Sequence, residues 1–307
     1  MNKQFSILLG SIVLLAGLIW LYLTFGAASG YIISQVRLPR LLLTILTGTV
    51  LAGTGYAYQV MLNNPLAEPY ILGISSGAAF GSILAAVSGL VVFMPLFGFA
   101  GALLTMLLVW SLSHWGGYFN STKLLLSGII VGMFFSALIS LMMYFNQQEI
   151  GNIINVLMGN LGHIFGRTEW RNFLIIFFVS IALLGYLMSL SRQLIIISTG
   201  DLMANSLGVD VKKIRRRIFL ISSLLTGVTV AYAGIIGFIG LVIPHLTRMI
   251  NGGNRRYTMF QSAFLGASLL IICDFIAQHI AVIEIPVGVI TAFIGCPFFI
   301  YVMMKSK

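Results

Sequence analysis

One short motif in this sequence matches a pattern that can carry out nucleophilic chemistry. Residues 73–77 read Gly-Ile-Ser-Ser-Gly, which fits the G-x-S-x-G arrangement around an active serine. A serine nucleophile needs a base within hydrogen-bonding reach, and His245 and His279 are the histidines in or near the later apolar stretches. Their spacing from Ser75 does not by itself place either ring beside it. Because glycine and serine are also common where membrane helices pack closely, an intramembrane serine protease is one alternative hypothesis.

The remaining chemical groups exclude several classes of function. Asp274 and Glu284 lie in or beside apolar stretches, where a carboxylate needs a partner, so each has either a structural hydrogen bond or a coupling role. Proton-coupled transport would use several deep acids, and the chain holds 7 Asp and Glu in all. No Gly-Lys dipeptide occurs, so the chain has no P-loop and cannot be an ATPase. The histidines are scattered, and Cys273 and Cys296 lie in apolar runs, so no metal site is expected.

Composition indicates the kind of structure that must position these groups. Of the 307 residues, 59% are hydrophobic and 8% are charged, whereas a soluble domain has about 25% charged residues. So few charges cannot cover a soluble surface, and so many apolar residues exclude a disordered chain. We therefore expect an all-α polytopic membrane protein. The excess of Lys and Arg in cytoplasmic loops of membrane proteins explains the formal charge of +10 without a nucleic-acid partner.

Stretches without charge predict about ten membrane-spanning helices, some of them short or broken, since one span needs about 20 apolar residues. Lys3 precedes the first stretch, which is too long for the apolar region of a signal peptide and is interpreted as a span. We expect a single transmembrane domain over residues 1–307 with both termini in the cytoplasm. This orientation leaves only Arg37, Arg40, Arg167 and Arg171 outside, of the 17 Lys and Arg. The predicted spans are residues 5–25, 41–61, 71–90, 96–113, 124–145, 173–191, 218–233, 236–250, 260–281 and 287–304.

Two prolines indicate broken helices. Pro65 lies in the link at residues 63–69 between the second and third spans, and Pro244 interrupts the short eighth span. Helices broken at membrane depth occur where a cavity or pathway exists, so both prolines are candidate pathway residues. His245 follows Pro244 and is either a packed, hydrogen-bonded residue or a substrate contact. A shift of 179 residues, which places Pro65 on Pro244, also aligns several small residues and predicts an inverted repeat.

The segment of residues 192–217 combines a short amphipathic stretch with a basic run. Asp201 can lie at the positively polarised start of a short helix that Gly208 ends, and Asp210 can cap a second short helix that ends at Arg217. The apolar side of the first helix would consist of Leu202, Met203 and Leu207. The segment is either a solvated basic loop on anionic lipid or a docking element for a cytoplasmic partner. The amphipathic stretch favours docking.

Arg37 and Arg40 open the second span within the sequence Arg-Leu-Pro-Arg. Lying one helical turn apart, they would present a positive pair at the external surface. They are either interface anchors, whose aliphatic stems lie along apolar surface, or a contact for carboxylates on an external partner. Arginine suits the second role because its planar fork binds a carboxylate through two hydrogen bonds.

Several longer motifs together resemble the FecCD-type permeases, which are the membrane subunits of ABC importers for iron-siderophores, haem and cobalamin. The resemblance covers about residues 37–304, and its motifs are specific in combination rather than singly. They are RLPRL at 37–41, NPLAEP at 64–69, ILGISSGA at 71–78, GIIGFIGLVIPH at 234–245 and EIPVG at 284–288, with Arg248, Thr291, Ala292 and Gly295.

The resemblance implies an assembly of several chains. The permease would be a homodimer with ten helices per subunit and a translocation path along the dimer axis. Two ATPase subunits, which bind ATP and Mg, would dock on the cytoplasmic side, and a substrate-binding protein would dock on the other. This chain would then have no catalytic residues and no cofactor of its own.

The resemblance also implies roles for residues on the cytoplasmic side. One segment would couple the chain to the ATPase, and one short loop would gate the pathway. The coupling residues would be Asp201, Ala204, Leu207 and Gly208. The gate would consist of Ser121 and Thr122 with a contribution from Ser75 and Ser76, beside the pathway candidates Pro65, Pro244 and His245.

On the opposite side, the resemblance implies that Arg37 and Arg40 meet acidic residues of the binding protein. One departure bears on this contact. Relatives often carry a further arginine where this chain has Gln278, four residues after Asp274. The positive charge available for docking is therefore reduced.

Together these features predict the permease subunit of an ABC importer in the bacterial cytoplasmic membrane. It would move a bulky iron chelate, a ferric siderophore, by alternating access powered by a separate ATPase. Cobalamin and haem are the alternative substrates within the family, and a secondary carrier or an intramembrane serine protease are the alternatives outside it.

Overall fold

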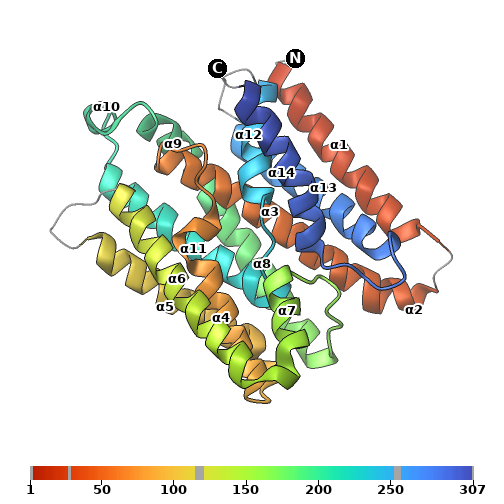
Figure 1. Cartoon of the computed structure of the whole chain (residues 1–307). Helices are drawn as coiled ribbons and strands as arrows, with labels where there is room; N and C mark the ends of the chain where they lie inside the picture. Colours follow the sequence, from red (N-terminus) through yellow and green to blue (C-terminus); the bar gives the residue numbers. More distant parts are fainter. Residues whose placement is uncertain (1–2, 27–28, 115–120, 252–256, 306–307) are drawn as a thin grey trace. The chain divides into compact units, whose positions relative to one another are not determined.

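The structure is a computed structural model that describes residues 3–26, 29–114, 121–251 and 257–305. Over these residues the chain is helical and contains no strand, which confirms the predicted fold class (Figure 1). The helices are α1 (Lys3–Thr24), α2 (Gly30–Ile32), α3 (Leu38–Met61), α4 (Ile74–Val87), α5 (Met94–Ser113), α6 (Ser121–Phe145), α7 (Ile150–Met158), α8 (Arg167–Ser189), α9 (Ser191–Ile197), α10 (Asp201–Ser206), α11 (Val211–Ala233), α12 (Ile239–Asn251), α13 (Thr258–His279) and α14 (Val287–Lys305). A π-helical turn, η1 (Ile33–Arg37), joins α2 to α3, and short 3₁₀ turns lie at Pro69–Leu72, Val91–Phe93 and Gln147–Glu149.

Each predicted span contains a helix. In the described part of the chain, six helical stretches are long and apolar enough to cross a membrane. They are Phe5–Thr24, Gly30–Met61, Val91–Ser113, Thr122–Phe145, Thr168–Ser189 and Thr258–His279. Ile74–Val87 and Val287–Val302 are shorter apolar helices. The other two predicted spans correspond to α11, whose first turns are strongly basic, and α12, which has 13 residues.

The third predicted span is interrupted near its start. The sequence predicts one span over residues 71–90, whereas α4 begins only at Ile74. Gly73 has a φ of 72°, a left-handed conformation that ends the preceding 3₁₀ turn and that residues with a side chain rarely adopt. The Gly73 backbone also lies against the Gly128 carbonyl oxygen of α6, where a Cβ would overlap. The first glycine of the GISSG motif is therefore explained by backbone geometry and packing.

The chain divides into two compact units that interleave along the sequence. The first unit comprises Met1–Tyr56, Asn160–Arg192 and Gly237–Lys307, and the second comprises Ala57–Gly159 and Gln193–Ile236. Each unit is described by itself below. The single domain over residues 1–307 stays a prediction.

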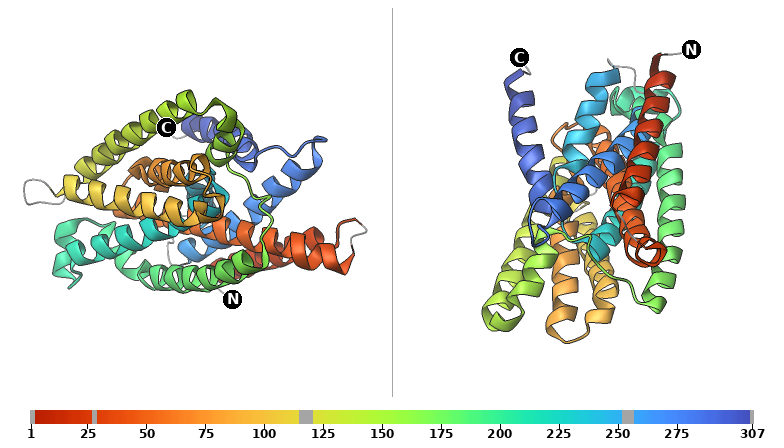
Figure 2. Two further views of the ribbon diagram at one scale, coloured as in Figure 1. Left: turned by 90° about the horizontal axis from the view of Figure 1, so that it is seen from below. Right: turned by 90° about the vertical axis from the view of Figure 1, so that its right-hand side faces the viewer.

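The second unit contains a tightly packed helical hairpin, α4 and α5, joined by residues 88–93 (Figure 2). Glycines line its interface, because Gly77 and Gly81 of α4 meet the backbone of α5 at Gly101 and Phe97. A Cβ at any of these glycines would overlap the facing helix, so the two backbones lie in direct contact. Gly227 of α11 likewise packs against α5.

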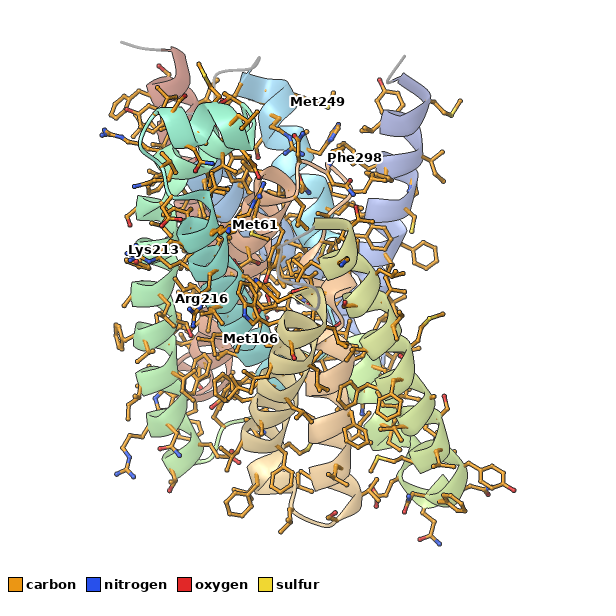
Figure 3. The ribbon with its side chains drawn as sticks, turned by 90° about the vertical axis from the view of Figure 1, so that its left-hand side faces the viewer. Met61, Met106, Lys213, Arg216, Met249 and Phe298 are labelled. Atoms are coloured by element: carbon orange, nitrogen blue, oxygen red, sulfur yellow. The ribbon has the colours of Figure 1, made fainter. Side chains whose placement is uncertain are left out.

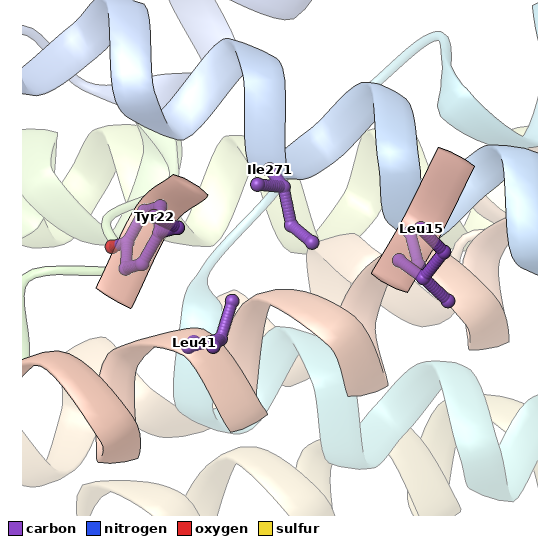
Figure 4. Packing of buried hydrophobic residues seen from close by; sticks show 5 residues of the cluster. Leu15, Tyr22, Leu41 and Ile271 are labelled. Carbon is purple, nitrogen blue, oxygen red and sulfur yellow. The ribbon is translucent and has the colours of Figure 1, made fainter. Parts of the chain in front are cut away.

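The first unit packs α1 and α13 around α3. Leu15 and Tyr22 of α1, Leu41 of α3 and Ile271 of α13 form part of one buried cluster (Figure 4). The opposite side of α1 is exposed and apolar, as expected for a helix that faces lipid. The α1 and α14 ends that lie nearest the chain termini are at the same end of this unit (Figure 1).

The predicted repeat is only partly reflected in local structure. The 179-residue shift pairs Pro65, which lies outside any helix, with Pro244, which lies inside α12, so the two prolines do not occupy equivalent positions. The packing of helices within each unit agrees better with a repeat than the two prolines do. In the first unit α3 contacts α13 at Gly48, and in the second unit α11 contacts α5 at Gly227. A repeat of five spans predicts this exchange, since it relates the second span to the seventh and the ninth to the fourth. The inverted relation itself stays a prediction.

Candidate functional site

The segment of residues 192–217 forms two helical pieces and the start of a long helix. α10 begins at Asp201 after Gly200, and Gly208, with a φ of 80°, follows its end. Both boundaries agree with the sequence analysis. Asp210 caps α11 by accepting a hydrogen bond from the Lys213 backbone N–H at 3.0 Å. The predicted second short helix is wrong in length, because α11 continues without a break through the apolar residues after Arg217 to Ala233.

α10 presents apolar side chains to its surroundings. Leu202, Met203 and Leu207 are 89%, 55% and 58% exposed. Ala204, by contrast, is fully buried and contributes a small apolar contact between α10 and the rest of the second unit. Because α10 lies outside the apolar spans, these exposed side chains have no lipid to cover them within the predicted topology. Such a surface is suited to contact another protein.

A bidentate ion pair joins α10 to α11. The Arg215 guanidinium donates through Nη1 to Asp201 Oδ2 at 2.7 Å and through Nη2 to Asp201 Oδ1 at 2.8 Å. Parallel hydrogen bonds of this kind fix the relative orientation of both groups and not only their distance. Lys213 and Arg216, labelled in Figure 3, are exposed on the same stretch of α11 and make its surroundings positive.

Arg37 and Arg40, the other candidate docking residues, have different surroundings. Arg37 donates through Nη1 to the carbonyl oxygens of Leu23 and Phe25, at 3.2 and 2.6 Å. The Arg40 side chain is only 11% exposed. Its docking role, like that of Arg37, stays a prediction.

Arg40 joins two carboxylates in the first unit. Its Nη2 donates to Asp274 Oδ1 at 2.8 Å and its Nε donates to both Asp274 oxygens at 3.1 Å. Its Nη1 donates to Glu284 Oε2 at 2.9 Å and to Oε1 at 3.1 Å. Asp274 is fully buried, whereas the Glu284 side chain is 55% exposed. The positive charge of Arg40 is therefore balanced inside the chain, mainly by the buried Asp274.

Two polar side chains complete this group, which we call the Arg40 cluster (Tyr22, Arg40, Asp274, Gln278 and Glu284). Tyr22 donates its hydroxyl to Asp274 Oδ2 at 2.7 Å. Gln278 donates through Nε2 to the Tyr22 oxygen and to Asp274 Oδ2, each at 2.8 Å. The prediction that Asp274 and Glu284 need partners is confirmed, and one arginine, Arg40, serves both, which the sequence did not predict. The opposite charges inside apolar stretches were the available signal.

The candidate gate and pathway residues belong to several different elements. Ser75 is buried and Ser76 half-buried in α4, and Pro65 is exposed in the link after α3. Pro244 is buried and His245 half-buried in α12, which belongs to the other unit. Thr122 is exposed near the start of α6, and the side chain of Ser121 lies outside the described residues. Their roles stay predictions.

The structural context of Ser75 does not match the nucleophile turn of an α/β-hydrolase. A G-x-S-x-G nucleophile sits on a sharp turn between a strand and a helix. Here a 3₁₀ turn precedes Gly73, and Ser75 lies within the first turn of α4. The ring of His279 stacks on Phe275 and its Nδ1 lies 2.8 Å from the Phe275 carbonyl oxygen. The motif is accounted for by helix packing at Gly73 and Gly77.

Residues after α11 serve a packing role in the second unit. The Ile236 backbone N–H donates to the Tyr70 hydroxyl at 3.2 Å, and the Ile235 N–H donates to the Val156 carbonyl oxygen at 3.1 Å. Burial raises the pKa of the Tyr70 phenol, so this group stays neutral. The start of the GIIGFIGLVIPH motif thus joins the link before α4 to α7.

Comparison with known proteins identifies the family of this chain. Residues 4–305 match the pattern of the FecCD transport family. The chain belongs to the FecCD transport family. It is 36% identical over 284 residues to the hemin transport system permease protein HmuU of Yersinia pestis, covering 89% of this chain and 83% of that protein. It is 35% identical over 283 residues to the molybdate import system permease protein MolB of Haemophilus influenzae, covering 90% of this chain and 82% of that one.

A solved structure agrees with this family assignment. It is described as an inward-facing conformation of a metal-chelate type ABC transporter, with a TM-score of 0.85 and 32% identity, over 98% of this chain and 99% of that one. The chain is therefore a multi-pass ABC importer permease of the FecCD family, as the sequence resemblance indicated. Both relatives are named as permease proteins of a transport or import system.

Proposed function

We propose that this FecCD-family permease moves a ferric siderophore across the bacterial cytoplasmic membrane as a homodimer. Two ATPase subunits bind ATP and Mg on the cytoplasmic side, and a substrate-binding protein delivers the cargo from outside. The exposed apolar face of α10 carries this proposal, since a helix outside the spans with such a face needs a protein partner. Its docking residues are Asp201, Ala204, Leu207 and Gly208, of which Ala204 anchors α10 from within.

The iron-chelate substrate is supported by two similar proteins. HmuU is named for hemin, and the similar solved structure is described as of the metal-chelate type. The molybdate permease MolB matches at nearly the same identity, so sequence similarity alone does not select a bulky cargo. Haem and cobalamin are the alternative substrates.

The outer partner contacts the chain near Arg37 and the half-exposed Glu284 in this proposal. Arg40 contributes by holding Glu284 in place, since its own charge is balanced by the buried Asp274. Gln278 supplies no charge to this surface and instead bonds to Tyr22 and Asp274. Docking is therefore expected to depend on fewer cations than in relatives with an arginine at this position.

Orientation and gating complete the proposal. The ends of α1 and α14 nearest the termini lie at one end of the first unit, which supports an even number of crossings and both termini in the cytoplasm. Ser121 and Thr122, with Ser75 and Ser76, form the cytoplasmic gate. The prolines Pro65 and Pro244, together with His245, border the pathway.

The assembly is tested by purifying the tagged chain from its native membrane in mild detergent and identifying co-purifying proteins by mass spectrometry. A P-loop ATPase recovered in equal amount supports the importer. Leu207→Glu should reduce ATPase recovery strongly, whereas Ile164→Glu, at a 72% exposed loop position, should not. Recovery of the permease alone, even after mild crosslinking, would favour a secondary carrier.

The substrate is tested by uptake into proteoliposomes that contain the permease, its ATPase and its binding protein. ATP-dependent uptake of a ferric siderophore, in preference to haem, cobalamin and molybdate, is the expected result. Preference for another of these compounds would replace the siderophore assignment and leave the importer assignment intact.

A further inference from the structure

The Asp201–Arg215 ion pair connects the exposed helix α10 to α11 within the second unit. The burial of Ala204 is a small apolar contact, and the turn at residues 207–210 contains Gly208 in a left-handed conformation. A small side chain and a turn do not fix the direction in which a six-residue helix points. The two parallel hydrogen bonds to Arg215 do, because they restrict both distance and angle.

The pair also connects two elements with different tasks. Asp201 is in the first turn of α10, next to the exposed Leu202, and its side chain is 53% exposed. The Arg215 side chain is 15% exposed, and it belongs to α11. Beyond Arg217, most residues of α11 are buried, and the helix packs closely on α5 at Gly227. A displacement of α10 is therefore transmitted through Arg215 to α11, and from α11 to the helices that pack against it in the second unit.

We infer that Asp201 and Arg215 are a positioning pair that transmits movement of α10 to α11. This inference rests on the proposed function, in which an ATPase binds α10. Neither residue needs to contact ATP or substrate. Without the pair, α10 can still bind its partner through its apolar side chains. It can then rotate about the turn at residues 207–210, so its movement no longer displaces α11.

ATPase binding and the coupling of ATP hydrolysis to transport then depend on different residues. Removing the exposed apolar face prevents the ATPase from binding. Replacing Arg215, which is not one of the docking residues, leaves binding and ATP hydrolysis in place and lowers the amount of substrate moved per ATP hydrolysed. The informative variants are Arg215→Ala, Arg215→Lys and the reversed pair Asp201→Arg with Arg215→Asp. Arg171→Glu, at an exposed position of α8, is the control for altered charge.

The first measurement is hydrogen exchange of the purified permease without partners. In the wild type the N–H groups of Ala204 and Leu207 donate to the Gly200 and Met203 carbonyl oxygens at 3.0 and 3.1 Å. Arg215→Ala should speed exchange at these amides about two- to threefold, because α10 loses its ion pair with α11. The reversed pair should restore slow exchange, and Arg171→Glu should not change it. Unchanged exchange in Arg215→Ala would overturn the positioning role.

The second measurement is the ratio of transport to ATP hydrolysis in proteoliposomes. Arg215→Ala should retain ATPase recovery and hydrolysis while this ratio falls about tenfold, and Arg215→Lys should be intermediate. A wild-type ratio in Arg215→Ala, with a correctly assembled complex, would overturn the inference. If the wild-type chain binds no ATPase, the proposed function and the coupling role fail together, while the exchange result still decides whether the pair orders α10.

Discussion

The Arg40 cluster and the Asp201–Arg215 pair use the same chemistry in different surroundings. In each, an arginine binds both carboxylate oxygens of an aspartate, at 2.8–3.1 Å for Arg40 and Asp274 and at 2.7–2.8 Å for Arg215 and Asp201. Asp274 is fully buried among helices, whereas Asp201 is 53% exposed at the start of α10. The comparison shows that the geometry of an ion pair does not define its role. A buried carboxylate requires its partner for the fold to be stable, and an exposed one can be removed with little effect on stability.

The strongest test of this comparison is Asp274→Asn. It leaves Arg40 buried with only the half-exposed Glu284 as a counter-charge, so the free energy of unfolding should fall by about 3–5 kcal/mol. Unfolding can be followed in detergent by reaction of a thiol dye with the buried Cys273, in a background where the exposed Cys296 is replaced by serine. The double change Arg40→Met with Asp274→Leu should recover much of the loss, because it removes both charges. A small effect of Asp274→Asn would mean that the cluster is not a stabilising element.

A smaller loss is expected from Tyr22→Phe. This change removes one hydrogen bond to Asp274 and leaves the ring packed in the cluster of Leu15 and Leu41, so about 1–2 kcal/mol should be lost. The same dye assay measures it. Tyr31→Phe, at a position that is 76% exposed, is the matched control and should have no measurable effect. Equal losses in both variants would contradict a specific role for Tyr22.

Glu284→Gln should cost less again, about 0.5–1 kcal/mol, because its side chain is 55% exposed and the exchange keeps a hydrogen-bond acceptor near Arg40. Its main consequence in our proposal lies in binding-protein docking, which is measured by the affinity of the isolated binding protein for the permease in detergent. A loss of stability as large as that of Asp274→Asn would show that the two carboxylates are equivalent.

The smallest stability effect is expected from Asp201→Asn, below about 0.5 kcal/mol in the dye assay, since the Asp201 side chain is 53% exposed. Added salt should weaken the wild-type pair, seen as faster exchange at α10, and should leave the Arg40 cluster unaffected. The comparison fails if Asp201→Asn unfolds the protein as readily as Asp274→Asn.

Features of the segment at residues 192–217 that depend only on neighbouring residues were predictable from the sequence. The short helix at Asp201, its end before Gly208 and the cap at Asp210 all follow from the hydrogen-bonding preferences of those residue types. The error in the length of the next helix has a clear cause. The basic residues up to Arg217 looked like the end of a loop, but lysine and arginine are good helix formers, and the apolar run behind them lets α11 continue.

The sequence by itself determined that this chain is an all-α membrane protein, that Asp274 and Glu284 must have partners, and that residues 192–217 include an amphipathic element. Composition and charge position are sufficient for these conclusions, because a charge in an apolar layer is costly wherever it lies. Only the tertiary structure decided that Arg40 partners both acids and that Arg215 partners Asp201. Sequence separations of 234 and 14 residues are bridged by helix packing, and no local pattern encodes which helix faces reach one another.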